Sequence, residues 1–237
     1  MNVLSLEGVT LAYPDGPGTV VGLDRLTLAV GDGEFVAVMG PSGSGKTTLV
    51  NVCCGLERPT AGGVVVDGVD LGSTSPRQRA LLRRSRIGVV HQTDDLDPVL
   101  RVVENVALPL VLGGIRRRDA LDLAVQALDR CRVGDLADRY RDQLSGGQRQ
   151  RVALARAVVG ERVLVLADEP TASLDTAAAR DLVQFLVVLA GEGTAVLMTT
   201  HDARLATFAD RVVLLRDGSL VEPSIESAVG SSSAPPA

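Results

Sequence analysis

Eight consecutive residues match the pattern G-x-x-x-x-G-K-[ST], which is typical of loops that hold the phosphates of a nucleotide. They are Gly40, Pro41, Ser42, Gly43, Ser44, Gly45, Lys46 and Thr47. Glycines let the backbone turn its N–H groups toward phosphate oxygens, and a helix that begins there adds its positive dipole end. Lys46 is expected to reach the β- and γ-phosphates, and the Thr47 hydroxyl is expected to bind Mg²⁺. The pattern therefore predicts a site for a magnesium nucleotide.

Two adjacent carboxylates follow an apolar run later in the chain. Residues 163–167 read Val-Leu-Val-Leu-Ala, and Asp168 and Glu169 come directly after them. The carboxyl end of a buried parallel strand is where an α/β sheet places its site. Asp168 suits Mg²⁺ through water, and Glu169 is the candidate general base for an attacking water. Taken alone, these residues are as compatible with a strand followed by an ordinary polar turn as with a catalytic site, so the functional interpretation depends on the phosphate loop.

A second glycine-rich helix start lies at residues 144–148, Leu-Ser-Gly-Gly-Gln, which we call the signature segment. A helical run follows at residues 149–159, and Ser145 is the candidate N-cap. The segment is either an ordinary capped helix or a second anion-binding helix terminus. Two such termini and one nucleotide suggest that the second serves a site on another copy of the chain.

Strands and helices alternate along the chain, which favours an α/β fold with a parallel sheet covered on both faces. Apolar runs predict strands at residues 34–39, 64–66, 87–90, 163–166, 195–198 and 212–215. Asp67-Gly68 is a hairpin-type turn signal after the second of these runs. A helix is expected over residues 45–54, directly after the phosphate loop.

The middle of the chain, residues 94–160, shows helical periodicity and no convincing strand. Leu121, Val125 and Leu128 recur at helical spacing and predict one buried face. We interpret this region as a helical lobe inserted into the α/β core. The last residues, 223–237, are rich in serine and proline and are expected to form a disordered tail.

Composition excludes several classes of protein. The net charge of -5 and the pI near 5.1 argue against a nucleic-acid partner. The basic runs at residues 83–86 and 116–118 are expected to be solvated helix faces or ends. Three cysteines form no disulfide framework or zinc pattern, and the adjacent Cys53 and Cys54 are expected to pack inertly in a core. No apolar run reaches the roughly 18 to 20 residues that span a bilayer, and no signal peptide is evident, so a soluble, cytosolic chain is expected.

The order of these features resembles an ABC-type ATPase subunit. The phosphate loop, the signature segment, the Asp168-Glu169 strand, Ser173-Leu174-Asp175 and His201 follow one another as in that family, from about Val3 to Val221. The resemblance implies a P-loop (RecA-like) core with a mostly parallel sheet, an N-terminal antiparallel β portion and an inserted α-helical subdomain. It also implies one ABC ATPase domain over residues 1–222, with a core at 1–93 and 161–222 and a helical subdomain at 94–160.

The resemblance further implies ATP and Mg²⁺ as cofactors and a homodimer as the working form. In this family two subunits pair head to tail, and each ATP lies between one phosphate loop and the signature segment of the other subunit. Ser145, Gly147 and Gln148 would therefore contact the nucleotide of the second copy. Thr48 stands beside Thr47 where relatives often have Ser-Thr, and it is assigned to the nucleotide too.

Four further positions carry roles over from the family. Tyr13 resembles the aromatic residue that stacks on adenine. Gln92 resembles the glutamine that contacts Mg²⁺ and the attacking water while linking to the membrane partner. Asp175 resembles the loop aspartate that communicates across the dimer. His201 resembles the histidine that senses the γ-phosphate, to which a neutral imidazole can donate one hydrogen bond.

Several segments resemble the subfamily that serves lipoprotein-release, macrolide- or peptide-export and cell-division permeases. They are residues 89–92, Pro98, residues 104–106, residues 109–110 and residues 166–171. An ATP-hydrolysing subunit that powers a separate integral membrane permease is implied, peripheral on the inner face of the cell membrane. Residues 93–98 are acidic where relatives are often more apolar. Because this segment would receive the permease's coupling helix, a more basic coupling segment is expected.

Three alternatives stand beside this interpretation. One is an importer ATPase subunit of the same fold. Another is an ATP-gated mechanical regulator of a membrane protein, without substrate transport. A P-loop kinase or GTPase is disfavoured, because it would leave the signature segment unexplained.

Overall fold

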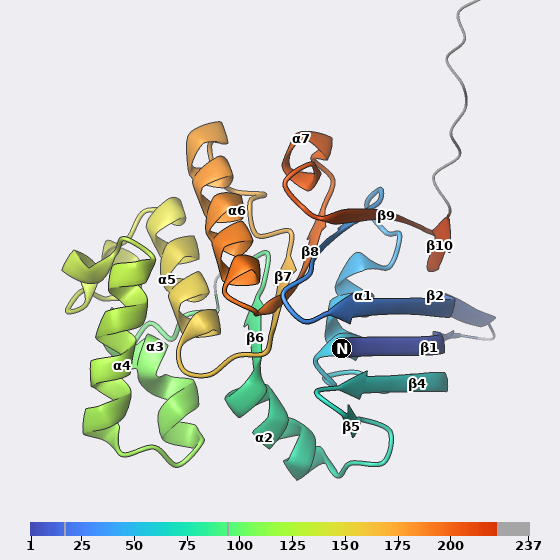
Figure 1. The fold of residues 1–237 in the computed structure, drawn as a ribbon, viewed down its shortest axis with the longest axis horizontal. Coiled ribbons are helices and arrows are strands. Elements are labelled where there is room, and N and C mark those ends of the chain that lie inside the picture. Colours follow the sequence, from blue (N-terminus) through green and yellow to red (C-terminus); the bar gives the residue numbers. More distant parts are fainter. Residues whose placement is uncertain (17, 94, 222–237) are drawn as a thin grey trace, which may run out of the picture.

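The structure, a computed structural model, describes residues 1–16, 18–93 and 95–221. Its elements alternate between strand and helix around two sheets (Figure 1), which confirms the predicted α/β fold. The tail expected at residues 223–237 and Asp94 of the acidic stretch lie outside the described residues.

The larger sheet has six strands in the order β10-β9-β3-β8-β7-β6. Five of them run parallel, and β10 pairs antiparallel with β9 at one edge. The bounds are β3 Phe35–Met39, β6 Ile87–Val90, β7 Leu164–Asp168, β8 Ala195–Thr200, β9 Arg211–Arg216 and β10 Ser219–Val221. Strands β7 and β8 are buried along their whole length, as expected for a parallel sheet covered on both faces.

The smaller sheet is antiparallel and has the order β2-β1-β4-β5. Its strands are β1 Asn2–Asp15, β2 Gly18–Gly31, β4 Ala61–Val66 and β5 Val69–Asp70. Asp67 and Gly68 join β4 to β5 with φ values of 50° and 75°. Two positive φ angles are what a tight hairpin turn requires, so the predicted turn is confirmed.

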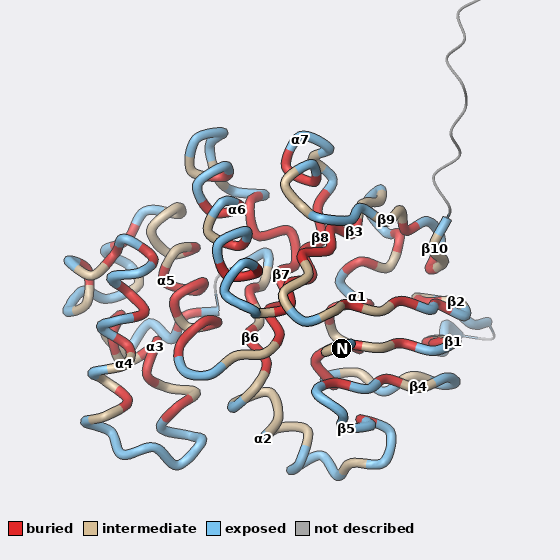
Figure 2. The backbone as a smooth tube through the Cα atoms, in the orientation of Figure 1, coloured by how far each residue is buried: buried red, intermediate tan, exposed pale blue. Residues whose placement is uncertain are grey.

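Side chains of β3 alternate between two cores. Phe35 and Ala37 lie in one core with residues of α3 to α7, while Val36 and Val38 lie in the other. The second core joins the two sheets through helix α1, Lys46–Cys53. Cys53 and Cys54 are buried there, and burial raises the pKa of both thiols, as suits inert packing. Figure 2 shows β7 and β8 buried at the centre of the molecule, while β9 and β10 at the sheet's edge are largely intermediate or exposed.

The remaining helices have the following bounds: α2 Pro76–Arg86, α3 Val102–Leu112, α4 Arg117–Arg130, α5 Gly146–Val158, α6 Thr176–Gly191 and α7 Ala203–Ala206, with 3₁₀ turns η1 Gly134–Leu136 and η2 Arg141–Gln143. Helices α3, α4 and α5 stand together at the end of the molecule opposite the smaller sheet (Figure 1). The boundaries expected for a helical subdomain, residues 94–160, stay a prediction.

The buried face of α4 differs from the predicted one. Leu128 is fully buried and Leu121 partly, but Val125 is 42% exposed, so its placement in the core was wrong. The buried positions are Ala120, Ala124, Ala127 and Leu128. Apolar size misled the prediction, because α4 meets its neighbours through alanines, which let helix axes approach closely.

Both basic runs lie at helix ends, as predicted. Residues 83–86 form the last turn of α2, where cationic side chains favour the helix dipole, and Arg83 Nη1 donates to the carbonyl oxygen of Gly55 at 3.1 Å. Residues 116–118 begin α4. There Arg116 and Arg117 pair with Asp119 and Glu104 at 2.9 Å and 2.6 Å.

Candidate nucleotide-binding site

The phosphate loop joins the end of β3 to the start of α1, and two of its glycines lie too close to other backbone for any side chain. A Cβ atom at Gly40 would lie 2.3 Å from the carbonyl oxygen of Leu215. Gly45 has a φ of 103°, and a Cβ atom there would lie 2.4 Å from the carbonyl oxygen of Gly22. Both glycines are therefore required by the packing of this chain itself.

The turn between β9 and β10 supports the same loop. The N–H of Gly218 donates to the carbonyl oxygen of Ser44 at 3.0 Å, and the carbonyl oxygen of Gly218 accepts from Asp24 N–H at 2.9 Å. Ser44 is buried, and within the described part of the chain its hydroxyl has no hydrogen-bond partner. Strands far apart in the sequence thus hold the loop in place.

Lys46, the first residue of α1, is the only lysine in the sequence. Its Nζ atom donates to the carbonyl oxygens of Gly40 at 2.8 Å and Pro41 at 3.0 Å. It also lies 3.3 Å from Oε1 of Glu169, and both side chains are about nine-tenths buried. Buried charges are tolerated when they are paired and hydrogen-bonded. A phosphate that enters the loop therefore competes with the Glu169 carboxylate for this ammonium.

Asp168 and Glu169 are positioned by the neighbouring strand β8. The hydroxyl of Thr199 donates to Oδ1 of Asp168 at 2.6 Å, and its oxygen accepts the backbone N–H of Glu169 at 3.0 Å. Glu169 has a φ of 46°, which is uncommon for a residue with a side chain. Such a conformation costs free energy and persists where the surroundings fix it, as they often do at active sites.

His201 completes the acidic end of the site. Its Nδ1 atom lies 2.8 Å from Oε2 of Glu169, while most of its side chain is exposed. Glu169 therefore contacts the loop lysine through one oxygen and the histidine through the other. This arrangement places an acceptor carboxylate between two groups that can hold a phosphate.

A cavity of about 690 Å³ opens over these residues, a size that accommodates a nucleotide. It is lined by Tyr13, Val20, Val21, Gly22, Ser42, Gly43, Gly45, Lys46, Thr47, Thr48, Gln92, Glu169 and His201. Most of the predicted site residues are therefore brought together. Gly40, Pro41, Ser44 and Asp168 are not among the lining residues; Ser44 and Asp168 are buried, and the carbonyl oxygens of Gly40 and Pro41 accept bonds from Lys46.

Ser145, Gly147, Gln148 and Asp175 do not line this cavity. Ser145 caps α5: its Oγ accepts the N–H of Gln148 at 3.3 Å, and Oε1 of Gln148 accepts the N–H of Ser145 at 2.9 Å. Asp175 caps α6 by accepting the N–H groups of Ala177 and Ala178, each at 2.9 Å. Within this single chain, all four lie at the starts of α5 and α6, away from the lining of the cavity.

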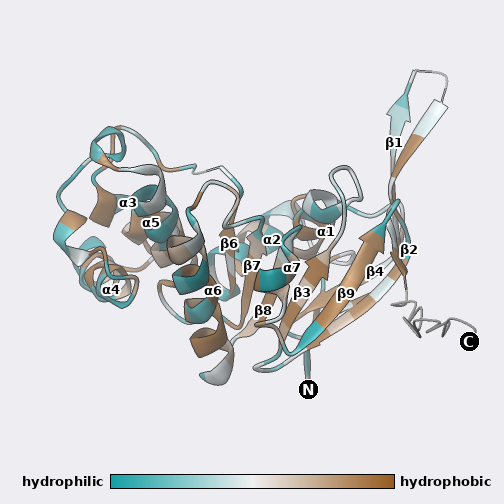
Figure 3. Ribbon diagram, turned by 90° about the horizontal axis from the view of Figure 1, so that it is seen from above, coloured by the Kyte–Doolittle hydropathy of each residue, from teal (hydrophilic) through white to brown (hydrophobic). Residues whose placement is uncertain are grey.

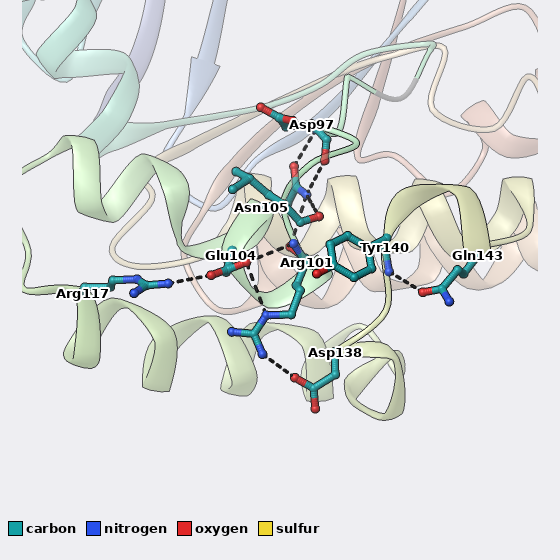
Figure 4. A network of polar contacts seen from close by, with 9 residues as sticks. Asp97, Arg101, Glu104, Asn105, Arg117, Asp138, Tyr140 and Gln143 are labelled. Carbon is teal, nitrogen blue, oxygen red and sulfur yellow. Dashed lines mark hydrogen bonds and ion pairs between the residues drawn. The ribbon is translucent and has the colours of Figure 1, made fainter.

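The segment after Gln92 is anchored by a polar network on α3 (Figure 4). Asn105 is 1% exposed; its Oδ1 accepts the N–H of Asp97 at 2.7 Å, and its Nδ2 donates to the carbonyl oxygen of Leu100 at 3.1 Å. Arg101 bridges Glu104 at 3.3 Å and Asp138 at 2.8 Å. Asn105, in the segment at residues 104–106, therefore fixes the loop at residues 97–100, which follows Gln92 of the cavity.

Several site-shaping residues were missed by sequence reasoning. Thr199 follows the strand predicted at residues 195–198, and its hydroxyl, two residues before His201, was the signal that could have placed it at the site. Gly22 and Gly218 carry no local pattern, because their role is to approach the phosphate loop from distant strands. Glu57 hydrogen-bonds the hydroxyl of Tyr13, and nothing in its own neighbourhood in the sequence indicates that contact.

The oxygen donors near the cavity suit Mg²⁺. Among the described residues, no cluster of three or more His, Cys, Asp or Glu side chains could hold a metal by itself. What the site offers is the Thr47 hydroxyl and the Gln92 amide at the cavity, with the Asp168 carboxylate beside Glu169. Mg²⁺ typically takes few protein oxygens and completes its shell with phosphate and water, so this donor set fits it.

Comparison with known proteins decides the family. A family model described as ABC transporter matches residues 23–172. The chain belongs to the ABC transporter family. It is an ATP-binding cassette with ATPase activity, and ATP is its nucleotide. Within the described residues, the longest apolar helix falls short of what crossing a bilayer demands.

The relatives of this cassette cover nearly all of it. YknY of Bacillus subtilis (strain 168), an uncharacterized ABC transporter ATP-binding protein, is 39% identical over 94% of this chain and 96% of its own length. The lipoprotein-releasing system ATP-binding protein LolD 1 of Rhodospirillum rubrum is 42% identical over 92% and 97%. The macrolide export ATP-binding/permease protein MacB of the same organism is 44% identical over 85% of this chain but 31% of its own length.

Solved structures confirm the cassette fold. The dimeric structure of MJ0796, a bacterial ABC transporter cassette, superimposes with a TM-score of 0.87 at 36% identity, covering 92% of this chain and 97% of that one. A second dimeric structure of MJ0796, in a post-hydrolysis state bound to ADP and Pi, gives a TM-score of 0.87 at 35% identity.

Proposed function

We propose that this ABC ATPase powers a separate integral membrane permease of an export-type system. The names of the similar LolD 1 and MacB proteins, lipoprotein-releasing and macrolide export, support this direction. The MacB name joins ATP-binding and permease activities, and the part of MacB that this chain matches is 31% of its length. LolD 1, in contrast, matches this chain over 97% of its own length, which supports a permease on a separate polypeptide. The cassette would lie on the inner face of the membrane through that permease.

The observation that carries the catalytic proposal is the placement of Glu169 between Lys46 and His201 at one cavity. The backbone and Lys46 of the phosphate loop bind the triphosphate, and the exchange of Glu169 for phosphate at Lys46 frees that carboxylate. Glu169 then accepts a proton from the attacking water, while His201 donates a hydrogen bond to the γ-phosphate.

Three neighbouring roles belong to the same proposal. Tyr13 stacks on adenine, and Gln92 positions the attacking water. Thr47, Gln92 and Asp168 would hold Mg²⁺, which would supply positive charge to offset the charge that develops on the phosphoryl group.

The substitution Glu169→Gln tests the general base. The amide keeps the shape of the side chain but cannot accept the proton, so the rate of hydrolysis falls roughly 10²- to 10⁴-fold. ATP affinity is retained or increased, because the carboxylate no longer competes for Lys46. Single-turnover hydrolysis and an ATP titration measure the two effects. Glu7→Gln, an exposed carboxylate on β1, is the matched control, and a wild-type rate in Glu169→Gln would refute the assignment.

We further propose that two copies close head to tail around two ATP molecules. The glycines of the signature segment support this proposal, because this chain alone does not need them. Among the residues that the structure describes, a Cβ atom at Gly146 would meet no other atom within 4 Å, and one at Gly147 would make an ordinary contact of 3.7 Å with Leu174. Neither has a positive φ.

The N–H groups of Gly146 and Gly147 lie in the first turn of α5 and have no acceptor within the helix. An external anion that approaches closely gives both features a use. Ser145, Gly147 and Gln148 would then contact the γ-phosphate of the partner copy, and Asp175 would communicate across the dimer.

Ser145→Arg tests the composite site. A bulky cation at the helix start blocks the approach of the second copy, so the ATP-induced dimer is lost while one chain still binds ATP. Size-exclusion chromatography with light scattering, in the Glu169→Gln background, measures the dimer. An ATP-induced dimer that persists in the Ser145→Arg variant contradicts the head-to-tail arrangement.

The contact with the permease is proposed at the segment that follows Gln92. One of its negative charges is compensated within the chain, since the Asp95 carboxylate pairs with Arg156 of α5. A basic coupling segment stays a prediction. Co-purification of the wild-type chain and of the Arg156→Ala variant, in which Asp95 loses its ion-pair partner, with the membrane subunit measures how strongly this charge affects the contact.

A further inference from the structure

Tyr13 is held from outside the cavity by a side chain that no motif includes. Its hydroxyl donates to Oε2 of Glu57, which lies 44 residues later in the chain. The aromatic ring stands next to Gly22, where an added Cβ atom would lie 2.9 Å from Tyr13 Cε2 and 3.2 Å from Thr48 Cγ2. The ring is thus fixed on one side by Gly22 and at its tip by Glu57.

Glu57 is in turn fastened to helix α1. Its Oε1 accepts from Nδ2 of Asn51 at 2.8 Å, and its backbone N–H donates to the carbonyl oxygen of Asn51 at 3.2 Å. Asn51 lies on α1, five residues after Lys46. A continuous chain of bonds therefore joins the ring of Tyr13 to the helix that begins at the phosphate loop.

These bonds hold a part of the chain that has little packing of its own. Tyr13 lies near the tip of the β1–β2 hairpin, opposite Val20 in the strand register. Figure 3 shows this hairpin extending away from the rest of its sheet. Val20 and Val21 are about half exposed. A hairpin tip with little packing moves readily, and an aromatic ring that must order before it stacks weakens the binding of a base.

We propose that Glu57, held by Asn51, is a positioning residue that fixes the Tyr13 ring for the adenine base. Glu57 thereby raises the affinity for ATP but not the affinity for tripolyphosphate, which has no base. The inference rests on the proposed stacking of Tyr13 on adenine. Glu57 itself does not line the cavity, and it acts through Tyr13.

The first experiment compares the dissociation constants of ATP for the full-length Glu57→Ala, Tyr13→Phe and doubly substituted chains. Loss of one hydrogen bond weakens ATP binding roughly three- to tenfold in each single variant. Because both substitutions remove the same bond, the double variant is no weaker than either single one. For Glu57→Ala, the turnover number at saturating ATP stays within about twofold of wild type. Glu57→Gln keeps an acceptor oxygen for the tyrosine hydroxyl and restores part of the affinity.

Tripolyphosphate, which has the phosphates and no base, distinguishes the two ends of the site. Its affinity is expected to be the same in wild type, Glu57→Ala and the control Glu7→Ala. An equal loss of ATP and tripolyphosphate affinity in Glu57→Ala would mean that Glu57 acts on the phosphate loop through α1, which overturns the proposal. Additive losses in the double variant would overturn it too.

Tyr13→Ala separates this inference from the stacking proposal. Loss of a stacked ring weakens ATP binding roughly five- to hundredfold. If Tyr13→Ala leaves the ATP affinity unchanged, the stacking itself is wrong. If Tyr13→Ala weakens binding while Glu57→Ala does not, the stacking stands and the positioning role of Glu57 is wrong.

Tyrosine absorbance reports the contact directly. The sequence has two tyrosines and no tryptophan, so Tyr140→Phe leaves Tyr13 alone. Burial raises the pKa of Tyr13, and the hydrogen bond and charge of Glu57 raise it further, while the bond from Thr48 opposes them. Glu57→Ala in the Tyr140→Phe background therefore lowers the pKa of Tyr13 toward the ordinary value of about 10. An unchanged titration would show that the two side chains do not meet, and would overturn the proposal.

Discussion

Helices α1 and α5 both begin beside glycines, but the two helix starts are built for different surroundings. At α1, Gly45 takes a φ of 103° and has no room for a Cβ atom, and no side chain of the described residues caps the helix. At α5, Ser145 and Gln148 form a complete capping box, and Gly146 and Gly147 have open space or ordinary contacts around them.

The difference distinguishes glycines that the fold of this chain requires from glycines that leave a surface open to a binding partner. The start of α1 is fixed by Gly22 and Leu215 of the same chain, so its free N–H groups line a preformed cavity. The start of α5 is stabilised by its own capping box and leaves its glycines accessible. A complete cavity at α1 and an accessible helix start at α5 together fit a nucleotide that is shared between two copies.

Gly45→Ala gives the largest expected effect on this comparison. Alanine must leave the left-handed conformation or meet the Gly22 carbonyl, so the free energy of unfolding falls by about 3–5 kcal/mol. Chemical denaturation measures it. Gly43→Ala is the control, since Gly43 has a φ of 80° but nothing within 4 Å, and the strain alone costs about 1 kcal/mol. Equal losses in both variants would show that the contact with Gly22 is unimportant.

Lys46→Ala removes the charge at the same helix start. Without its charge-assisted bonds to phosphate, the dissociation constant of ATP rises roughly 10- to 100-fold. Lys46→Arg recovers part of this, because a guanidinium keeps the charge but not the compact shape. Since Lys46 is the only lysine, labelling with an amine-reactive reagent followed by mass spectrometry reports whether its ammonium group is accessible. Bound ATP is expected to slow this labelling. Labelling that ATP does not slow would contradict contact between Lys46 and phosphate.

Ser145→Ala gives a smaller effect at the other helix start. Loss of the cap lowers the free energy of unfolding by about 1 kcal/mol. Ser145→Asn, which retains a capping oxygen, is the control, and thermal unfolding compares them. If the alanine variant is as stable as wild type, the capping box contributes nothing and Ser145 is retained for another purpose.

Gly146→Ala gives the smallest effect on stability. The site has room for a methyl group and helical backbone, so the free energy of unfolding stays within about 0.5 kcal/mol of wild type. The ATP-induced dimer weakens nonetheless, because the methyl group keeps the second copy from the helix start. A dimer of unchanged affinity would remove the contrast with α1.

Local patterns predicted the strands that carry the phosphate loop and the acidic pair, because strand burial and glycine turns depend on residues close in sequence. The turn at Asp67-Gly68 is confirmed for the same reason. The buried face of α4 was mistaken at Val125, since helix packing selected small alanines rather than the largest apolar residues. No local pattern reports that preference.

By itself the sequence determined the chemistry of this cassette: a phosphate loop with one lysine, a strand that ends in two carboxylates, and a second helix start suited to an anion. These follow from neighbouring residues, whose spacing fixes which groups a turn or helix end presents. The tertiary structure decided their relations. It placed Glu169 between Lys46 and His201, closed the loop against Gly22 and Leu215, and tied Tyr13 to Glu57. Contacts between residues tens of positions apart arise when the whole chain folds, so no window of sequence contains them.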